Sequence, residues 1–288
     1  MKKVIVIKNL CKSYGKVKAV NDISFDVMEG EIFAFIGPNG AGKSTTIRTL
    51  LGLIKADKGE VRVMGLPFKK SKTYLKDIGY LPSEAIFYNN MRVGEVITYS
   101  AKLRGVDCTD EARRLCEIFE VDTKKRVDQL SLGNRKKLGI ICAMQHKPKL
   151  YIMDEPTSGL DPLMQKEFFK LIHSRQQEGA TVFLSSHVLS EVQNNCDKAA
   201  IIKEGKIVAV DSIEQLAKRN SAKKVTLRGV TDLPYGIEYT PDSEGEDWIS
   251  FFYNGEIKKL ISQLGRMKIT DLTITEPDLE EVFMHYYK

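Results

Sequence analysis

The stretch that most constrains the fold of this chain is Gly37-Pro38-Asn39-Gly40-Ala41-Gly42-Lys43-Ser44-Thr45. It fits the pattern G-x-x-x-x-G-K-[ST], in which glycines let backbone N–H groups come close to an anion. Lys43 would bring a positive charge to the terminal phosphates, and the Ser44 hydroxyl would ligate Mg²⁺. The pattern therefore predicts a loop that wraps the phosphates of a nucleotide.

The residues on either side of this loop support the same interpretation. Residues 31–36 form a short apolar run typical of a buried strand, and residues 45–51 have the apolar spacing of a helix. Bound phosphate would then lie at the positively polarised N-terminus of a helix. A glycine-rich turn with an exposed lysine is the simpler alternative, but it does not explain the strand–loop–helix order. We expect the chain to bind a nucleoside triphosphate.

Length and composition limit the remaining possibilities. The 288 residues suffice for one large domain and a small one. No apolar stretch approaches the roughly 18 residues of a membrane span, and the N-terminal run at 4–7 is too short for a signal peptide. The five cysteines form no C-x-x-C pair, which favours reduced thiols in the cytosol. A net charge of +6 is compatible with a membrane surface, nucleotide or nucleic acid, and selects none of them.

The order of expected strands and helices predicts an α/β fold. A β-rich front half has expected strands at 3–12, 23–28, 31–36, 60–64 and 78–81. From about 84 to 130 the pattern is helical, which indicates a helical lobe set against the sheet. Expected strands at 149–153, 180–185, 199–203 and 206–210 then alternate with helices at 163–178, 188–196 and from 212. Such alternation is typical of a mainly parallel sheet that binds nucleotide at the carboxyl ends of its strands.

The composition changes after residue 220. Strand-like pieces at 224–228, 248–253 and 268–275 enclose an expected helix at 256–264, and a last helix is expected from Pro277. We interpret residues 221–288 as a small accessory α+β domain. No group of residues in it resembles an active site, and we expect Trp248 to belong to its core.

Two carboxylates end an apolar strand downstream of the phosphate loop, in Leu150-Tyr151-Ile152-Met153-Asp154-Glu155-Pro156. Asp154 would hold the coordination shell of the metal ion, and Glu155 would polarise a water molecule directed at the γ-phosphate. Phosphoryl transfer needs mainly positioning and charge neutralisation, so one base among several donors suffices. An exposed acidic strand end would be the better explanation only if the phosphate loop were absent.

Four segments of the chain, in the same order as in the family, resemble motifs of ATP-binding cassette (ABC) ATPases. The segment Asp154–Asp161 resembles the Walker B motif and D-loop, and Leu130–Lys137 resembles the signature L-S-G-G-Q. Ser185-Ser186-His187 lies where the family has its switch histidine, and Lys12-Ser13-Tyr14-Gly15 resembles the aromatic A-loop. The resemblance covers about residues 1–220. It implies a P-loop NTPase fold with a mainly parallel sheet core, an antiparallel β subdomain and the helical lobe.

The resemblance also assigns roles to individual residues. The cofactors implied are ATP and Mg²⁺, and the catalytic residues implied are Lys43, Glu155 and His187, the last as a γ-phosphate contact. The implied metal ligands are Ser44 and Asp154. The nucleotide would be bound by Tyr14, Gly37, Pro38, Asn39, Gly40, Ala41, Gly42, Lys43, Ser44, Thr45, Ser131, Gly133 and Asp161.

The sequence departs from the family pattern at two motifs. In the signature, Leu132 and Asn134-Arg135 differ from the usual residues, but Ser131 and Gly133 are retained. In the run Gly79-Tyr80-Leu81-Pro82, which leads into the Q-loop, Ser83 occupies the glutamine position and Glu84 follows. Either Ser83 or Glu84 would reach the metal or the attacking water, and the choice between them stays open.

The family resemblance implies partners as well as ligands. One chain carries one phosphate loop and one signature, so two complete ATP sites require a head-to-tail homodimer. A chain without a membrane segment would dock on a separate integral-membrane permease, at the cytoplasmic face of the cell membrane. The run Gly79–Glu84, the signature and the tail 272–283 resemble ABC-2 exporters linked to bacitracin-like antibiotic resistance. We therefore expect the ATP-hydrolysing subunit of an exporter, with no nucleic-acid partner.

Two other functions remain as alternatives. A soluble ABC ATPase acting on ribosomes or DNA would carry a second cassette in the same chain or a long coiled coil, and this chain has one cassette and no sustained heptads. A kinase or GTPase with a P-loop would not explain the signature.

Overall fold

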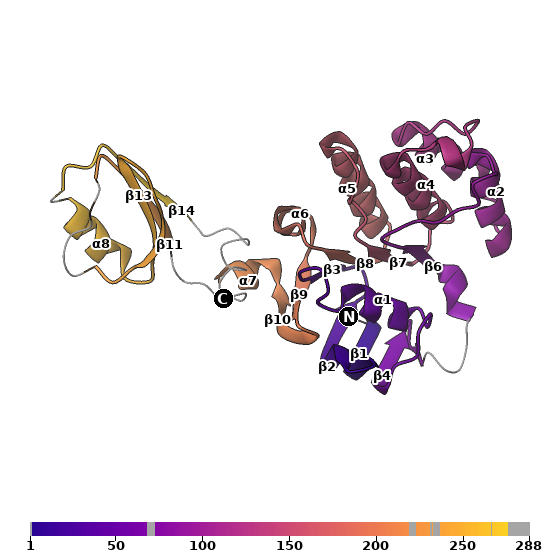
Figure 1. Cartoon of the computed structure of the whole chain (residues 1–288), viewed down its shortest axis with the longest axis horizontal. Coiled ribbons are helices and arrows are strands. Elements are labelled where there is room, and N and C mark those ends of the chain that lie inside the picture. The colour runs from indigo at the N-terminus through magenta and orange to yellow at the C-terminus, as the bar shows by residue number, and fades with distance from the viewer. Residues whose placement is uncertain are drawn as a thin grey trace. The chain divides into compact units, whose positions relative to one another are not determined.

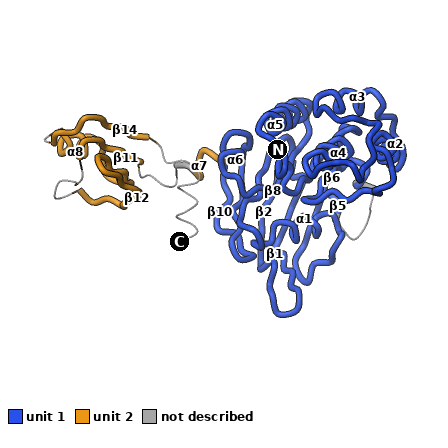
Figure 2. Tube along the Cα trace, turned by 45° about the horizontal axis from the view of Figure 1, so that its top comes forward, with its two compact units in different colours: residues 1–212 blue, residues 213–288 orange. Residues whose placement is uncertain are grey.

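The computed structural model describes residues 2–67, 73–218, 223–230, 232, 237–265 and 267–275. Contacts within the chain divide it into two units, residues 1–212 and 213–288, which have separate colours in Figure 2. This division falls shortly before residue 220, where the composition changes. The assignment of residues 1–220 to the ATPase domain and 221–288 to an accessory domain stays a prediction.

A six-stranded sheet forms the centre of the first unit, in the order β10-β9-β3-β8-β7-β6. The strands from β9 to β6 run parallel, and β10 pairs antiparallel with β9. All residues of β3, β7 and β8 are buried, because helices and a second sheet cover the faces of this parallel sheet (Figure 1). The predicted mainly parallel core is thus confirmed. The strand bounds are Ile32–Ile36 for β3, Ile78–Leu81 for β6, Leu150–Asp154 for β7, Thr181–Ser186 for β8, Lys198–Lys203 for β9 and Lys206–Ser212 for β10.

A second, antiparallel sheet packs against this core in the order β2-β1-β4-β5. Gly15, at a φ of 57°, turns the chain between β1 and β2. Phe25 of β2 stacks on Phe33 and Phe35 of β3 and on Phe183 of β8, with ring centroids 5.3 to 6.0 Å apart. This aromatic cluster joins the two sheets directly below the phosphate loop, which follows β3. The bounds are Lys3–Tyr14 for β1, Val17–Met28 for β2, Lys58–Val63 for β4 and Leu66–Pro67 for β5.

The helices lie where the apolar spacing predicts them. The segment predicted as a helical lobe contains α2 and α3, and it leads into α4, which begins at the signature. Among the described residues, no helix has the length and apolar character needed to span a bilayer. The helices of the first unit are α1 Lys43–Leu50, α2 Val93–Arg104, α3 Thr109–Ile118, α4 Leu132–Met144, α5 Pro162–Gln177 and α6 Leu189–Asn195, with short 3₁₀ turns at Thr73–Asp77 and Val127–Gln129.

The second unit starts with α7, Ile213–Lys218, and contains an antiparallel sheet in the order β12-β13-β11-β14. The strand β12 was not predicted, because all its residues are exposed and no apolar pattern marks it. Trp248 is half-buried and lies outside the apolar cluster of this unit. The helix expected from Pro277 lies outside the described residues. The bounds are Lys223–Arg228 for β11, Thr240–Glu244 for β12, Trp248–Tyr253 for β13, Ile257–Leu264 for α8 and Asp271–Thr275 for β14.

Candidate functional site

The phosphate loop connects β3 to α1, and two of its glycines are required by close packing. A Cβ on Gly37 would lie 2.4 Å from the carbonyl oxygen of Ile202 in β9. A Cβ on Gly42 would lie 2.3 Å from the carbonyl oxygen of Ala19 in β2, and the φ of Gly42 is 109°. The loop is therefore held between strands of both sheets, which leaves only glycine at these positions.

Lys43 begins α1, and its ammonium group folds back over the loop. Its side chain is 6% exposed, and Nζ donates to the carbonyl oxygens of Gly37 at 2.6 Å and Pro38 at 3.3 Å. The same nitrogen lies 3.1 Å from Oε1 of Glu155. An ammonium held between a glycine-rich loop and a carboxylate at a helix N-terminus fits the terminal phosphates of a nucleotide.

The two carboxylates predicted at the end of β7 are ordered by one hydroxyl group. Asp154 is buried, and its Oδ1 accepts from Ser185 Oγ at 2.6 Å. The backbone N–H of Glu155 in turn donates to Ser185 Oγ at 2.9 Å. Glu155 has a φ of 50°, in the left-handed region that few non-glycine residues adopt. Ser185, on the neighbouring strand β8, therefore fixes the directions of Asp154 and Glu155 relative to each other.

The switch histidine predicted from the sequence meets the predicted base. Nδ1 of His187 lies 2.8 Å from Oε2 of Glu155, whose other oxygen faces Lys43. The structure therefore brings together Lys43, Glu155 and His187 from three separate segments of the chain. A carboxylate between a cation and an imidazole is placed to take a proton from a water molecule.

The residues predicted to hold Mg²⁺ offer oxygen donors. Ser44 is the second residue of α1 and Asp154 ends β7, and contacts join these two elements. Among the residues that the structure describes, no three or more His, Cys, Asp or Glu side chains form a metal-binding group. One hydroxyl and one carboxylate suit Mg²⁺, which usually keeps several waters and binds to the phosphates of its substrate. The donor set fits that ion.

The signature residues lie against the D-loop of the same chain. Ser131 caps α4 by accepting from the N–H of Asn134 at 3.3 Å. A Cβ on Gly133 would lie 2.7 Å from the carbonyl oxygen of Gly159. Asp161 caps α5 through a 3.0 Å bond from the N–H of Met164. Ser131 is exposed, so this helix N-terminus is open to a ligand from outside the chain.

The remaining predicted residues have other contacts. Tyr14 is 49% exposed at the end of β1, and Lys12 Nζ lies 5.5 Å from the centre of its ring. Ser83 is half-buried and offers its backbone carbonyl to Lys136, while Glu84 is exposed. That Ser83 or Glu84 takes the place of the Q-loop glutamine stays a prediction.

Sequence reasoning missed three polar residues of this site. Ser185 orders the two carboxylates, and Lys136 contacts the backbone of Glu155. Glu191 on α6 accepts from Thr157 Oγ1 at 2.8 Å, and its pKa is raised by burial and by the nearby charge of Glu155. A signal existed for Lys136 alone, because it precedes Ile140 by one helical turn and so lies within the apolar stripe of its helix.

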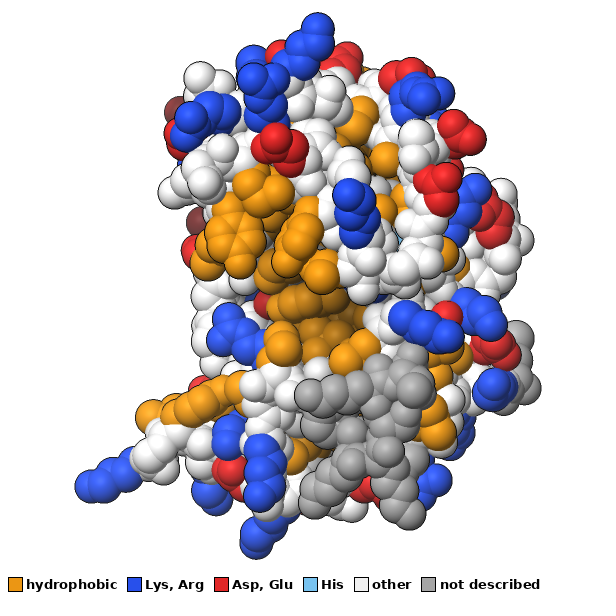
Figure 3. Space-filling view, turned by 90° about the vertical axis from the view of Figure 1, so that its right-hand side faces the viewer, with side chains coloured by type: hydrophobic (Ala, Val, Ile, Leu, Met, Phe, Trp, Pro, Cys, Tyr) orange, Lys and Arg blue, Asp and Glu red, His pale blue; other side chains and the backbone are white. Residues whose placement is uncertain are grey.

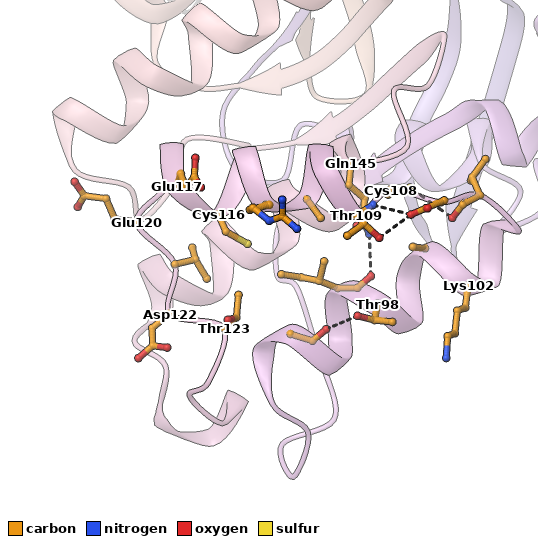
Figure 4. Close-up of a pocket in the computed structure, with 18 of the residues that line it drawn as sticks. Thr98, Lys102, Cys108, Thr109, Cys116, Glu117, Glu120, Asp122, Thr123 and Gln145 are labelled. Carbon is orange, nitrogen blue, oxygen red and sulfur yellow. Dashed lines mark hydrogen bonds between the residues drawn. The ribbon is translucent and has the colours of Figure 1, made fainter.

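A cavity of about 1060 Å³ lies elsewhere, between α2, α3 and the turns that follow them (Figure 4). Its wall includes Cys108, Cys116 and Thr98 together with the acidic side chains of Glu117 and Glu120. Gln145 also lines it, and the buried amide of this residue donates to the carbonyl oxygen of Ile97 at 3.1 Å. None of the predicted site residues lines this cavity, so it is separate from the site around Glu155.

Comparison with known proteins agrees with this geometry. Residues 20–158 match the family model described as ABC transporter. Bacitracin transport ATP-binding protein BcrA of Bacillus licheniformis is 36% identical to this chain, and the alignment covers 99% of this chain and 97% of the relative.

Two solved structures have the same fold. One, described as an ATP-binding subunit of an ABC transporter, has a TM-score of 0.70 and 29% identity, and the match covers 75% of this chain and 92% of that chain. The other is a dimeric ATP-binding cassette in a post-hydrolysis state with ADP and Pi, with a TM-score of 0.66 and 22% identity over 73% of this chain and 98% of that chain. The P-loop NTPase cassette predicted from the sequence is confirmed. The chain belongs to the ABC transporter family, in which it is the subunit that binds and hydrolyses ATP with Mg²⁺ to power transport.

Proposed function

We propose that two copies of this chain hold two Mg-ATP molecules between them and drive export of a peptide antibiotic or other drug through a separate permease. The likeness to a bacitracin transport protein over 99% of the chain supports this substrate class. One observation carries the proposal: the carboxylate of Glu155 lies between Nζ of Lys43 and Nδ1 of His187.

Each of these three residues has a role that follows from its contacts. Glu155 accepts a proton from the water that attacks the γ-phosphorus of ATP. At the same time the bond breaks between the γ-phosphorus and the oxygen that bridges it to the β-phosphate. Lys43 leaves the carbonyl oxygens of Gly37 and Pro38 to contact the terminal phosphates. His187 holds Oε2 of Glu155 and would contact the γ-phosphate. Ser44 and Asp154 would hold Mg²⁺, which would neutralise charge on the phosphates.

The Ser131 cap supplies the second half of each site. In one chain, Gly133 lies against the D-loop at Gly159, and the exposed start of α4 at Ser131 is free to bind phosphate. A C2 pair would place this helix N-terminus over the nucleotide of the other protomer, with Asp161 of the D-loop beside it. ATP then favours the closed pair, because it contacts both protomers only in that state.

The permease would dock on an exposed apolar surface that we call the lobe surface, made by Ile86, Tyr88, Tyr99 and Leu103. Figure 3 shows hydrophobic side chains gathered on this side of the first unit. Ile86 is 88% and Leu103 70% exposed, and a cavity of about 470 Å³ lies among these residues. Exposed apolar surface of this kind marks an interaction site. Docking here would hold the chain at the cytoplasmic face of the membrane.

The decisive experiment compares Glu155→Gln with the wild-type chain. We expect unchanged Mg-ATP affinity by calorimetry and a kcat lower by about 10³-fold, because the amide cannot take the proton. With turnover blocked, Mg-ATP should convert the variant from monomer to dimer in light scattering. Full turnover in this variant would exclude Glu155 as the base.

A second substitution tests the shared site. In the Glu155→Gln background, Ser131→Arg should keep the monomer's affinity for Mg-ATP but prevent the ATP-dependent dimer, because its bulk closes the helix N-terminus. Leu53→Arg, a change at an exposed position after α1, serves as the matched control and should still dimerise. An ATP-dependent dimer that persists with Ser131→Arg would contradict the shared site.

A further inference from the structure

Both backbone polar groups of Glu155 are held by side chains. Its N–H donates to Ser185 Oγ at 2.9 Å, and its carbonyl oxygen accepts from Lys136 Nζ at 2.9 Å and, more weakly, from the backbone N–H of Ser158 at 3.3 Å. Glu155 needs this support, because a φ of 50° is strained for a residue with a Cβ. If one of these bonds were lost, the backbone of Glu155 could relax and its carboxylate would leave its place.

Lys136 makes a second bond that reaches another part of the site. Its Nζ donates at 2.6 Å to the carbonyl oxygen of Ser83, at the Q-loop position. Lys136 is 4% exposed, so water has little access to its ammonium group and the group depends on these carbonyl oxygens as acceptors. One buried cation thus joins two loops of the catalytic centre.

The position of Lys136 in the chain connects these loops to the signature. It lies in the second turn of α4, whose first turn contains Gly133 and whose cap is Ser131. A rigid helix therefore carries both the phosphate-binding end and the ammonium that holds Glu155. The bond to Ser83 uses the backbone, so it does not depend on the serine that replaces the usual glutamine.

We propose that Lys136 is a positioning residue for ATP hydrolysis. It holds the backbone of Glu155 and of Ser83 at a fixed position relative to the signature helix α4. This inference rests on the proposed role of Glu155 as the base. Lys136 itself contacts neither the nucleotide nor the attacking water. Its effect on the rate comes from the place that it gives to the Glu155 carboxylate.

The test replaces Lys136 with methionine, which has a similar length and no N–H donors. We expect Lys136→Met to lower kcat by about 100-fold, because a shift of about 1 Å at a catalytic group costs that much. The KM for ATP and the calorimetric affinity for Mg-ATP should stay as in the wild-type chain, since Lys43 and the phosphate loop are untouched. Replacing a residue that only supported the fold would not lower kcat while leaving the KM for ATP unchanged.

Two further variants complete the comparison. Lys136→Arg keeps a cation with several donors and should recover most of the lost rate. Lys166→Met, an exposed lysine on α5, is the matched control and should have wild-type kcat. If Lys136→Met does not fold, Lys136→Gln takes its place, because its shorter amide can serve one carbonyl oxygen but not both, and the same drop in kcat is expected.

The outcomes separate this inference from the function on which it rests. Wild-type kcat in Lys136→Met, or in Lys136→Gln if the methionine variant does not fold, overturns the positioning role. An equal loss of rate in Lys136→Met and Lys136→Arg also overturns it, because the donors would then be irrelevant. Glu155→Gln, measured in parallel, tests only the role of Glu155 as the base. If that role is wrong, this variant shows it independently of the Lys136 variants.

Discussion

At the scale of single residues, this site depends on positions where the backbone leaves no choice of side chain. Gly42 has a φ of 109° and lies too close to the carbonyl oxygen of Ala19 for any Cβ. Glu155 also has a positive φ, but it carries the side chain that the reaction needs. Backbone strain at Glu155 is therefore tolerated for its chemistry and is offset by the bonds to Ser185 and Lys136.

We expect Gly42→Ala to abolish measurable Mg-ATP binding and to lower the free energy of unfolding by about 3 kcal/mol, because the new Cβ meets the backbone of Ala19 and the φ is unfavourable. Urea unfolding and calorimetry measure the two effects. Gly15→Ala is the control: its φ is 57° and nothing lies near its Cβ position, so about 1 kcal/mol is expected without loss of binding. Equal effects of the two variants would contradict the packing argument.

At the scale of elements, a buried ion pair joins the helical lobe to the helix α5. Arg175 on α5 is 2% exposed and donates to Glu111 on α3 and, at 2.8 Å, to Oε2 of Glu178. Burial raises the pKa of Glu111, but the hydrogen bond from Arg114 and the charges of Arg175, Arg114 and Lys147 outweigh it, so that the pKa lies below its ordinary 4.5. The ionised form of Glu111 thus stabilises the contact between α3 and α5.

We expect Glu111→Gln to lower the free energy of unfolding by about 2 kcal/mol at neutral pH, because a buried guanidinium loses a charged partner. The pKa of Glu111 is depressed in the folded state, so its contribution is present above 4.5 and is lost as the pH falls through the folded-state value. Urea unfolding of both chains should therefore show a difference that shrinks below pH 4.5.

An exposed ion pair on the same helix provides the control for this prediction. Glu167 pairs with Lys170 at 2.6 Å, with side chains 30% and 59% exposed. Glu167→Gln should change the free energy of unfolding by no more than about 0.5 kcal/mol. A difference between wild type and Glu111→Gln that does not vary with pH would contradict the electrostatic explanation.

At the scale of the whole molecule, two apolar cores lie in separate parts of the chain. The core beneath the phosphate loop draws on both sheets of the first unit, and the core of the second unit contains Val225, Leu227, Phe251 and Leu260 among others. The two clusters have no residue in common. All the residues proposed to bind ATP lie before residue 162, and His187 lies before 212.

We expect a chain ending at residue 220 to keep the wild-type affinity for Mg-ATP, because the phosphate loop, its core and the carboxylates all remain. Calorimetry on the full and shortened chains measures this, and light scattering with Mg-ATP in the Glu155→Gln background shows whether the second unit strengthens the dimer. Loss of affinity on shortening would mean that residues after 220 contribute to the site.

Much of the site follows from the sequence because its motifs are local. The phosphate loop, the Asp154-Glu155 pair and the Ser131 cap each depend on a few consecutive residues, whose backbone conformation and helix capping follow from their own side chains. The parallel sheet was predictable from the alternation of apolar runs with helical spacing. The strand β12, which has no buried residue, had no such pattern to reveal it.

Contacts between distant segments were decided only by tertiary structure. Lys136 reaches Ser83 across 53 positions of the chain, and Glu191 reaches Thr157 across 34. Such pairs form because several packed elements bring them together, and no local preference of either residue encodes that meeting. The sequence alone therefore determined the chemistry of this protein, its loop for phosphate and its base for water. The packing of helices and strands decided which buried side chains hold that base in place, because a hydrogen bond depends on distances that only the folded chain sets.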